Sequence, residues 1–407
     1  MIAQLWRNTG LIVAAFVIVL TGIFFGRPVI LLIGVFLLVL TGFAEWMAGQ
    51  TLTNIGLEHQ VSHRVMEIGQ TVVAEMVFEN RMPWPIAHVS WENSLPQAVD
   101  VHGPGKLVDN APAHRQVLSG QLHVGANERV RVQYRLTGRA RGRWMVGPAA
   151  VWFSDTFGFT RLYRDMPDQI YITVWPKRYP IAAQFVSRNL LEGTIRGRPW
   201  DVPEPYRIAG TRPYVLGDPV RHIHPYASAR SGQLMVKQLE TVQNRHLEVI
   251  VHPLTHREHW MGIDVDVLED LLSLAASVVE STLLTGIEVG LTLSGSLPGY
   301  PYGYTARPRR GQNVLAEYLT ALSWLQPSGA IHQILVDRMA EMSWRVNSAS
   351  VVVLVLALWE PAMAPILAVW RRRGTRVVIV TNGDLDQESL ALSYPIYRWR
   401  EGRLAHA

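Results

Sequence analysis

The sequence contains no cysteine and only three lysines. Without cysteine the chain forms no disulfide, no thiolate metal site and no cysteine nucleophile. A thiol-free chain suits the cytosol and the periplasm equally, so this absence does not fix the compartment. Arginine supplies the other 35 of the 38 basic residues. Guanidinium groups suit carboxylate, aromatic and lipid-phosphate partners, so the formal charge of +5 does not by itself predict nucleic-acid binding, and none is expected.

The common enzyme signatures are also absent. The chain has no P-loop, no Gly-x-Ser-x-Gly nucleophile elbow, no dinucleotide-binding fingerprint and no His-Glu-x-x-His zinc motif. We therefore expect neither enzymatic activity nor a cofactor.

The length of 407 residues exceeds what one core accommodates and predicts several domains. The predicted fold class is multidomain α+β, with an N-terminal transmembrane helical hairpin, an antiparallel β-sandwich-like domain and a doubly wound α/β domain. The predicted segments are an anchor over residues 1–46, a β-rich domain over 54–175, a connector over 176–245 and the α/β domain over 246–407.

Two apolar runs predict the anchor. Leu11 to Phe25 and Val29 to Phe43 contain no charged residue, and Gly26-Arg27-Pro28 separates them as a turn. With their flanks, both runs approach the roughly 20 residues that about 30 Å of hydrocarbon requires. Trp6 and Trp46 stand at the ends opposite the turn, where indole rings favour the membrane interface. A cleaved signal peptide is the alternative, but no small-residue cleavage site follows and a second run begins at once.

The anchor's flanking charges predict its orientation. The amino terminus and Arg7 lie on the side of the soluble body, whereas Arg27 alone lies in the turn. Because cytoplasmic flanks carry the excess of basic residues, the body is expected in the cytoplasm.

Residues 54–175 alternate apolar and polar side chains in short segments separated by Pro- and Gly-rich turns, a pattern typical of an antiparallel sandwich. Five arginines share odd-numbered positions and therefore one strand face: Arg131, Arg135, Arg139, Arg141 and Arg143. A solvated face explains them, and a lipid-phosphate or acidic-partner site is the alternative. The connector's prolines favour extended chain.

From residue 246 onward, apolar strands alternate with helical patterns, which indicates a parallel sheet covered by helices. Strands are predicted at 247–251, 287–293, 351–356 and 376–380, and helices at 266–284, 314–325 and 362–373. Asp266 and Glu269 have capping-box spacing at the start of the first helix. Thr381 to Asp384 follows the last strand, at the edge where open α/β sheets bind ligands.

One motif precedes this sheet. It runs Tyr214-Val-Leu-Gly217-Asp218-Pro-Val-Arg221-His-Ile223-His, continues to Ala229-Arg230, and is followed by an apolar segment that ends at Glu240. This pattern resembles the signature of the family called domain of unknown function 58, with Pro225 in place of a tryptophan. The segment Ser154-Asp-Thr-Phe-Gly-Phe159 is similar to a second family motif.

The resemblance implies several properties. It implies two membrane helices before a β-rich domain, a C-terminal domain like those of von Willebrand factor type A, and a functional link to MoxR-type AAA ATPases. The leading hypothesis is thus a membrane-anchored, non-enzymatic interaction module that works with such an ATPase in an envelope or chaperone-like complex. A structural scaffold of an envelope assembly is an alternative.

The motif residues themselves have two interpretations. Gly217-Asp218 reads as a turn in which Asp218 accepts backbone N–H groups, and Arg221 and Arg230 are candidates to bind its carboxylate bidentately. A buried clasp of this kind is one interpretation, and a recognition surface is the other.

Metal binding is the last question that the sequence raises. A von Willebrand A domain binds magnesium through Asp-x-Ser-x-Ser after its first strand, but here that position holds His252, Leu254 and His256. A cation that prefers oxygen ligands finds none there, so no metal is expected. The alternative is a metal-dependent hydrolase that uses His222, His224 and the loop from His252 to His259.

Overall fold

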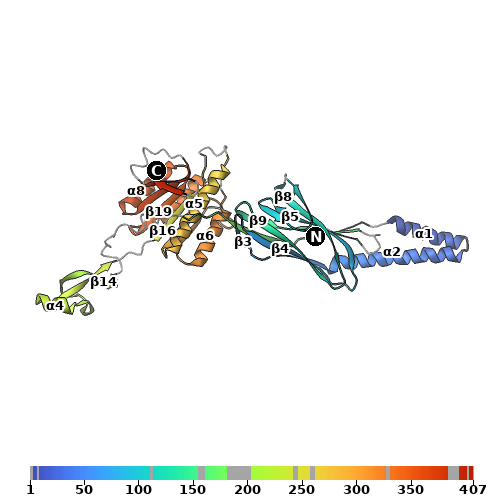
Figure 1. Ribbon diagram of the computed structural model, residues 1–407, viewed down its shortest axis with the longest axis horizontal. Coiled ribbons are helices and arrows are strands. Elements are labelled where there is room, and N and C mark those ends of the chain that lie inside the picture. Colours follow the sequence, from blue (N-terminus) through green and yellow to red (C-terminus); the bar gives the residue numbers. More distant parts are fainter. Residues whose placement is uncertain are drawn as a thin grey trace. The chain divides into compact units, whose positions relative to one another are not determined.

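The computed structural model describes residues 3–6, 9–110, 113–154, 161–180, 203–241, 246–256, 262–326, 331–383, 394–400 and 403–406. The chain divides into two compact units, residues 1–176 and 177–407, which are described separately (Figure 1).

The first unit begins with two apolar helices, α1 (Thr9–Phe24) and α2 (Pro28–Asn54), which pack side by side (Figure 1). Two glycines allow this close approach. A Cβ atom on Gly22 would lie 2.5 Å from the backbone nitrogen of Leu31, and one on Gly34 would lie 2.7 Å from that of Val19. The helices turn through Gly26, whose positive φ of 59° suits glycine.

Within the described residues, one helix is both long and apolar enough to cross a membrane. It covers Pro28–Thr51, 24 residues with a mean hydropathy of 2.3. The apolar part of α1, Gly10–Phe24, is shorter than a span usually requires. The second span therefore remains a prediction.

Both ends of the helix pair continue into strands of the β domain. Strand β1 (Ala3–Trp6) precedes α1 and pairs antiparallel with β12 (Arg161–Met166), and β2 (Ile55–Val61) follows α2 directly. Trp6, predicted at a helix end in an aromatic belt, thus lies in a strand opposite Arg161. The anchor was predicted to cover residues 1–46, and helix α2 itself continues to Asn54.

The β domain consists mainly of two sheets that face each other. One sheet has the order β1-β12-β11-β5-β8-β7 and the other β2-β4-β9-β6, while β10-β13-β3 forms a small third sheet. The bounds of these strands are β3 (Val65–Glu67), β4 (Thr71–Asn80), β5 (Ile86–Pro96), β6 (Val99–His102), β7 (Lys106–Asn110), β8 (Arg115–Val124), β9 (Arg129–Gly138), β10 (Gly142–Val146), β11 (Ala149–Ser154) and β13 (Ile170–Trp175).

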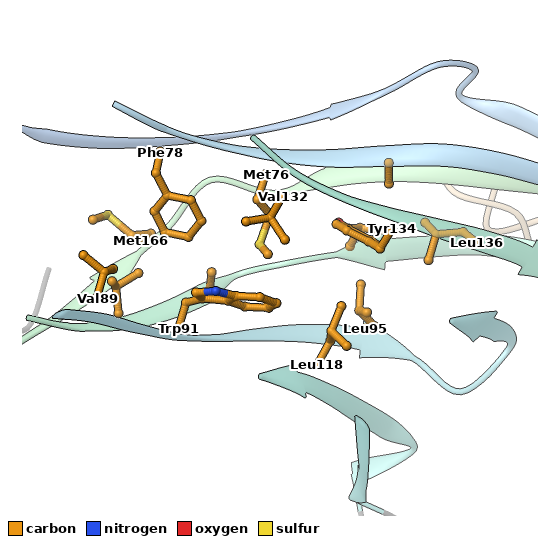
Figure 2. Packing of buried hydrophobic residues seen from close by; sticks show 14 of the residues in the cluster. Met76, Phe78, Val89, Trp91, Leu95, Leu118, Val132, Tyr134, Leu136 and Met166 are labelled. Carbon is orange, nitrogen blue, oxygen red and sulfur yellow. The ribbon is translucent and has the colours of Figure 1, made fainter. Parts of the chain in front are cut away.

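Alternating side chains of the two large sheets fill the space between them (Figure 2). Met76 and Phe78 from β4, with Tyr134 from β9, face Trp91 from β5 and Leu118 from β8. This arrangement follows from the period-two alternation of the sequence, since one face of each strand is apolar.

A polar network lies within this apolar core. The imidazole of His59 is enclosed, with Nδ1 3.0 Å from Asp168 Oδ2 and Nε2 3.1 Å from Asn93 Oδ1. Asn93 donates onward to the hydroxyl of Tyr134 at 3.1 Å. The network joins strands β2, β5 and β9, which belong to the two opposed sheets.

The arginine cluster divides between two strands. Arg131 and Arg135 lie exposed on the outer face of β9, which ends at Gly138. Arg143 lies on β10, with its guanidinium 4.1 Å from the Tyr171 ring. Because β9 ends at Gly138 and β10 begins at Gly142, the five arginines do not lie on one continuous strand. The exposed side chains on β9 fit the solvated-face interpretation.

The second unit contains a hairpin module, residues 203–241 (Figure 1). Strands β14 (Pro203–Pro213) and β15 (Met235–Thr241) pair antiparallel, and between them lie a short 3-10 turn, Val220–His222, and helix α4 (Pro225–Ser231). Part of the predicted extended connector is therefore a strand pair with a helix. Residues 181–202 of that connector lie outside the described residues.

The rest of the unit is a seven-stranded sheet of order β18-β17-β16-β19-β20-β21-β22, in which the inner five strands run parallel. Helices α5 and α6 cover one face, and α7 and α8 contribute to a core on the other. The strands are β16 (His246–His252), β17 (Glu288–Leu293), β18 (Tyr304–Arg309), β19 (Ser350–Leu356), β20 (Arg376–Thr381), β21 (Ile396–Arg400) and β22 (Arg403–His406), and the helices are α5 (Val265–Leu284), α6 (Gln312–Trp324), α7 (Ile331–Met342) and α8 (Ala364–Arg372).

This sheet is doubly wound, as its four predicted strands and three predicted helices indicate. The chain turns back at β16, so β16 and β19 flank the point where the strand order reverses. The predicted capping box of α5 was wrong. Asp264 caps the helix instead, accepting from the Val267 backbone N–H at 3.1 Å, so α5 begins at Val265.

Candidate functional site

The hairpin module carries the sequence motif, and its turn is held by one ion pair. Arg212, at the end of β14, donates from Nη1 and Nη2 to the two carboxylate oxygens of Asp218, both at 2.7 Å. Asp218 Oδ2 also accepts from the Val215 N–H at 3.0 Å. Gly217 has a φ of 109°, which few other residues adopt at low cost. The predicted partners Arg221 and Arg230 were therefore wrong, since the carboxylate binds Arg212.

The ion pair gives the turn a defined pH dependence. The hydrogen bonds from Arg212, and then the Val215 N–H, lower the pKa of Asp218 to about 2. A carboxyl whose pKa is lowered on folding stabilises the fold above its ordinary value near 3.8, and this contribution is lost as pH falls toward 2.

We expect Asp218→Asn to expose the turn to proteolysis at neutral pH, because the amide carries no charge to pair with Arg212. Cleavage between Tyr214 and Pro219, followed by mass spectrometry, measures this effect. The same substitution at Asp109, an exposed carboxylate on β7, is the control and should leave this cleavage unchanged. Equal cleavage of both variants would contradict a structural role for Asp218.

Exposed apolar and basic side chains follow this turn between residues 216 and 230, and we call this set the motif face. Leu216 is 96% exposed, and Val220 and Tyr226 are each 75% exposed. Arg221 and Arg230 are exposed as well, and neither is paired with another described residue. The clasp interpretation therefore applies to Asp218 alone, and the two predicted arginines belong to the surface.

The other motif residues hold the module together. The Tyr214 N–H donates to Leu234 O at 2.9 Å, and Ile223 bridges to Val236 of β15. Helix α4 is tied to β15 because the Met235 N–H donates to Ser228 Oγ at 2.8 Å. Ala229 is exposed on this helix, and Glu240 lies in β15.

The carboxyl edge of the parallel sheet holds the other predicted positions. His252 ends β16, is buried, and has its Nδ1 2.8 Å from Ser294 Oγ at the end of β17. Leu254 and His256 follow in a half-buried loop, where Thr255 Oγ1 accepts from the N–H of Asp264. Asn382 Nδ2, after β20, donates to Val267 O in the first turn of α5 at 2.7 Å.

In the described parts of the chain, no three His, Asp, Glu or Cys side chains lie close enough to hold a metal ion. His224 Nδ1 accepts from the Ala227 N–H as the cap of α4. His259 and Asp384 lie outside the described residues. The hydrolase interpretation thus gains no ligand set from the described residues.

One buried ion pair was not predicted from the sequence. Glu248, in the middle of β16, has a fully enclosed side chain and accepts from Arg345 Nε at 2.9 Å and Nη2 at 3.1 Å. Gly290 on the neighbouring strand leaves room for it, since a Cβ there would lie 2.2 Å from Glu248 Oε2. The pair lies in the sheet interior and away from the carboxyl edge, so its role is structural.

Comparison with solved structures gives only distant likenesses. A cohesin module of a Clostridium perfringens family 33 glycoside hydrolase covers 29% of this chain and 96% of its own, at 11% identity and a TM-score of 0.23. The match to the major pilin SpaD of Corynebacterium diphtheriae covers 29% of this chain and 35% of the pilin, at 11% identity and a TM-score of 0.22. At these scores neither likeness informs the fold or the function.

Comparison with known sequences identifies the region that carries the motif. Uncharacterized protein YeaD of Bacillus subtilis is 21% identical over 255 residues, which span 62% of this chain and 59% of that relative. Residues 210–390 match the family described as "Protein of unknown function DUF58". This match includes the motif face and most of the α/β sheet. The resemblance predicted from the motif is thereby confirmed, since residues 210–390 match the DUF58 family model.

Proposed function

We propose that this protein is a membrane-anchored, non-enzymatic interaction module whose docking element is the motif face. The observation that carries the proposal is the exposure of Leu216, Val220 and Tyr226 in the same segment as Arg221 and Arg230, which are exposed and pair with no described residue. Several exposed large apolar groups within one short segment are characteristic of interaction sites. Tyrosine and arginine are also residue types that contribute most to binding energy.

The charge of the motif face selects the partner. Asp218 is neutralised by Arg212, and between residues 210 and 237 Asp218 is the only acidic residue. Arg221 and Arg230 therefore face a partner with acidic groups next to apolar ones. The family resemblance motivates a MoxR-type AAA ATPase as that partner. By the same resemblance, we propose two membrane spans, a body in the cytoplasm and a C-terminal domain of the von Willebrand A type.

Binding of the purified full chain to the purified MoxR-type ATPase of the same organism tests the proposal. We expect Leu216→Ser to weaken binding on the order of tenfold, because it removes a side chain that the partner would bury. Arg230→Ala should also weaken binding, and more so at low salt than at high salt.

Leu284→Ser is the matched control, since Leu284 is 78% exposed at the end of α5, outside the motif face. The proposal predicts that this variant binds like the unchanged chain. Absence of binding by the unchanged chain, or an equal loss in Leu284→Ser, would rule out the motif face as the docking element for this ATPase.

A further inference from the structure

The end of the β domain that adjoins α2 forms a second basic surface. The Arg81 N–H donates to the carbonyl of Asn54, the last residue of α2, at 3.1 Å. Arg164 Nη1 donates to the carbonyl of Ile55 at 3.2 Å. These bonds place the start of β2 and the turn after β4 at the point where the candidate span has just ended at Thr51.

Two arginines at this end share one carboxylate. Arg81 donates from Nε and Nη2 to Glu79 Oε2 at 3.1 and 2.8 Å, and Arg129 donates from the same atoms to Glu79 Oε1 at 3.0 and 2.7 Å. The arginine side chains are 67% and 69% exposed, whereas that of Glu79 is 23% exposed. The group has a net charge of +1, and each guanidinium keeps its Nη1 donor free of Glu79.

Aromatic side chains lie at the same end. Trp46 of α2 stacks on Phe43 with ring centroids 5.7 Å apart, and Trp84 lies 5.5 Å from Trp46. Trp84 belongs to the turn that follows Arg81, so the helix and the β domain both contribute an indole. Indole rings favour the boundary between hydrocarbon and headgroups.

The depth of this surface follows from helix geometry. Asn54 lies eight residues beyond Trp46, which corresponds to about 12 Å of helix. The headgroup layer on one side of a bilayer is about 5–7 Å thick. If α2 spans the membrane with Trp46 at its boundary, this layer therefore lies between the indole rings and Asn54, and the Arg81 end of the β domain faces the lipid phosphates.

We propose that Arg81 and Arg129 bind the phosphate groups of anionic lipids and hold the β domain against the membrane surface. Guanidinium donates bidentate hydrogen bonds to phosphate oxygens, and Glu79 fixes both side chains in place before a lipid arrives. A lipid suits this position better than a soluble phosphate does, because Trp46 and Trp84 place the arginines beside the bilayer. The proposal rests on the membrane anchor and not on the motif face.

The test uses the full chain in nanodiscs of mixed phosphatidylcholine and phosphatidylglycerol. After mild detergent release, native mass spectrometry measures the ratio of the two lipids that remain bound. The unchanged chain should retain phosphatidylglycerol preferentially, and Arg129→Gln should reduce this preference about fivefold, the usual effect of one basic residue at an anionic surface. Glu79→Gln should increase the preference, because it raises the local charge from +1 to +2.

Arg135→Gln is the matched control. Arg135 is exposed on the same face of β9 as Arg129 and lies about 20 Å farther along the strand, so its loss should not change the lipid ratio. An equal effect of both arginine variants, or a lower preference in Glu79→Gln, would overturn the proposal. The proposal would also be overturned if inorganic phosphate abolished the phosphatidylglycerol preference of the unchanged chain, because the surface would then bind free phosphate.

Alkaline extraction of membranes separates this inference from the anchor on which it rests. A chain that stays in the membrane but shows no phosphatidylglycerol preference overturns the lipid contact and leaves the anchor intact. A chain that is extracted overturns both.

Discussion

Replacing Arg345 with methionine should lower the free energy of unfolding of the α/β sheet by about 3–5 kcal/mol at pH 8. Glu248 is fully enclosed, and the two hydrogen bonds from Arg345 offset the loss of water around its carboxylate. Methionine fills a similar volume but carries no charge, so the variant leaves a buried carboxylate without a counter-ion.

The loss of unfolding free energy in the Arg345→Met variant should become smaller as the pH falls. Burial raises the pKa of Glu248 to about 7, even though Arg345 acts to lower it. A carboxyl whose pKa is raised on folding binds more protons in the folded state, so stability falls as pH rises from about 4.5 to about 7. Without Arg345 this pKa rises further. At pH 5 the Arg345→Met variant therefore keeps a protonated Glu248 and recovers part of its loss.

Denaturant unfolding followed by hydrogen exchange in peptides from β16 and β19 measures this effect separately from the β domain. Arg309→Met is the control, because its ion pair with Glu317 is about half exposed and is expected to contribute less than about 1 kcal/mol. The double variant Glu248→Gln/Arg345→Met should recover most of the loss, since no buried charge remains. If Arg345→Met lowered the free energy of unfolding no more than Arg309→Met does, the Glu248–Arg345 pair would not stabilise the sheet as described.

Local sequence patterns predicted the frame of the α/β domain because its inner strands and helices are strongly patterned. The run at 351–356 is apolar and β-branched, and it forms β19 at the sheet centre. The edges were missed for identifiable reasons. Strand β18 contains Pro308, which argues against a strand. Strands β21 and β22 lie at the far edge, and arginines alternate with other residues in β21.

The errors at the candidate site concern which residues pair. Asp218 was assigned to arginines that follow it, whereas its partner Arg212 precedes it by six residues, at the end of β14. Glu248 interrupts an apolar strand, which signals a buried partner. That partner is 97 residues away, so a single sequence does not identify it.

The composition of the anchor predicted its two helices but not their contacts with the β domain. Uncharged apolar runs predicted two helices, and two helices are present. The sequence did not predict that α2 runs eight residues past Trp46, so that Trp46 meets Trp84 of the β domain. Helix α2 is apolar on all sides, and its composition alone does not mark where the bilayer would end.

The polar network in the sandwich core predicts the second large effect. Asn93→Ala should lower the free energy of unfolding of the β domain on the order of 3 kcal/mol, because it removes partners from two buried groups. Asn93 Oδ1 is 3.1 Å from His59 Nε2, and Asn93 Nδ2 donates to the Tyr134 hydroxyl. Both partners are almost completely buried, so water does not replace the amide at low cost.

Hydrogen exchange in peptides from β4 and β9 measures this loss without a contribution from the second unit. Gln133→Ala is the matched control, since Gln133 is exposed on β9 and its amide donates to Glu75 of the neighbouring strand. Tyr134→Phe should cost less than Asn93→Ala, because it leaves one unsatisfied donor and keeps the His59 contact. If Asn93→Ala were as stable as Gln133→Ala, the network would not be what holds the two sheets in register.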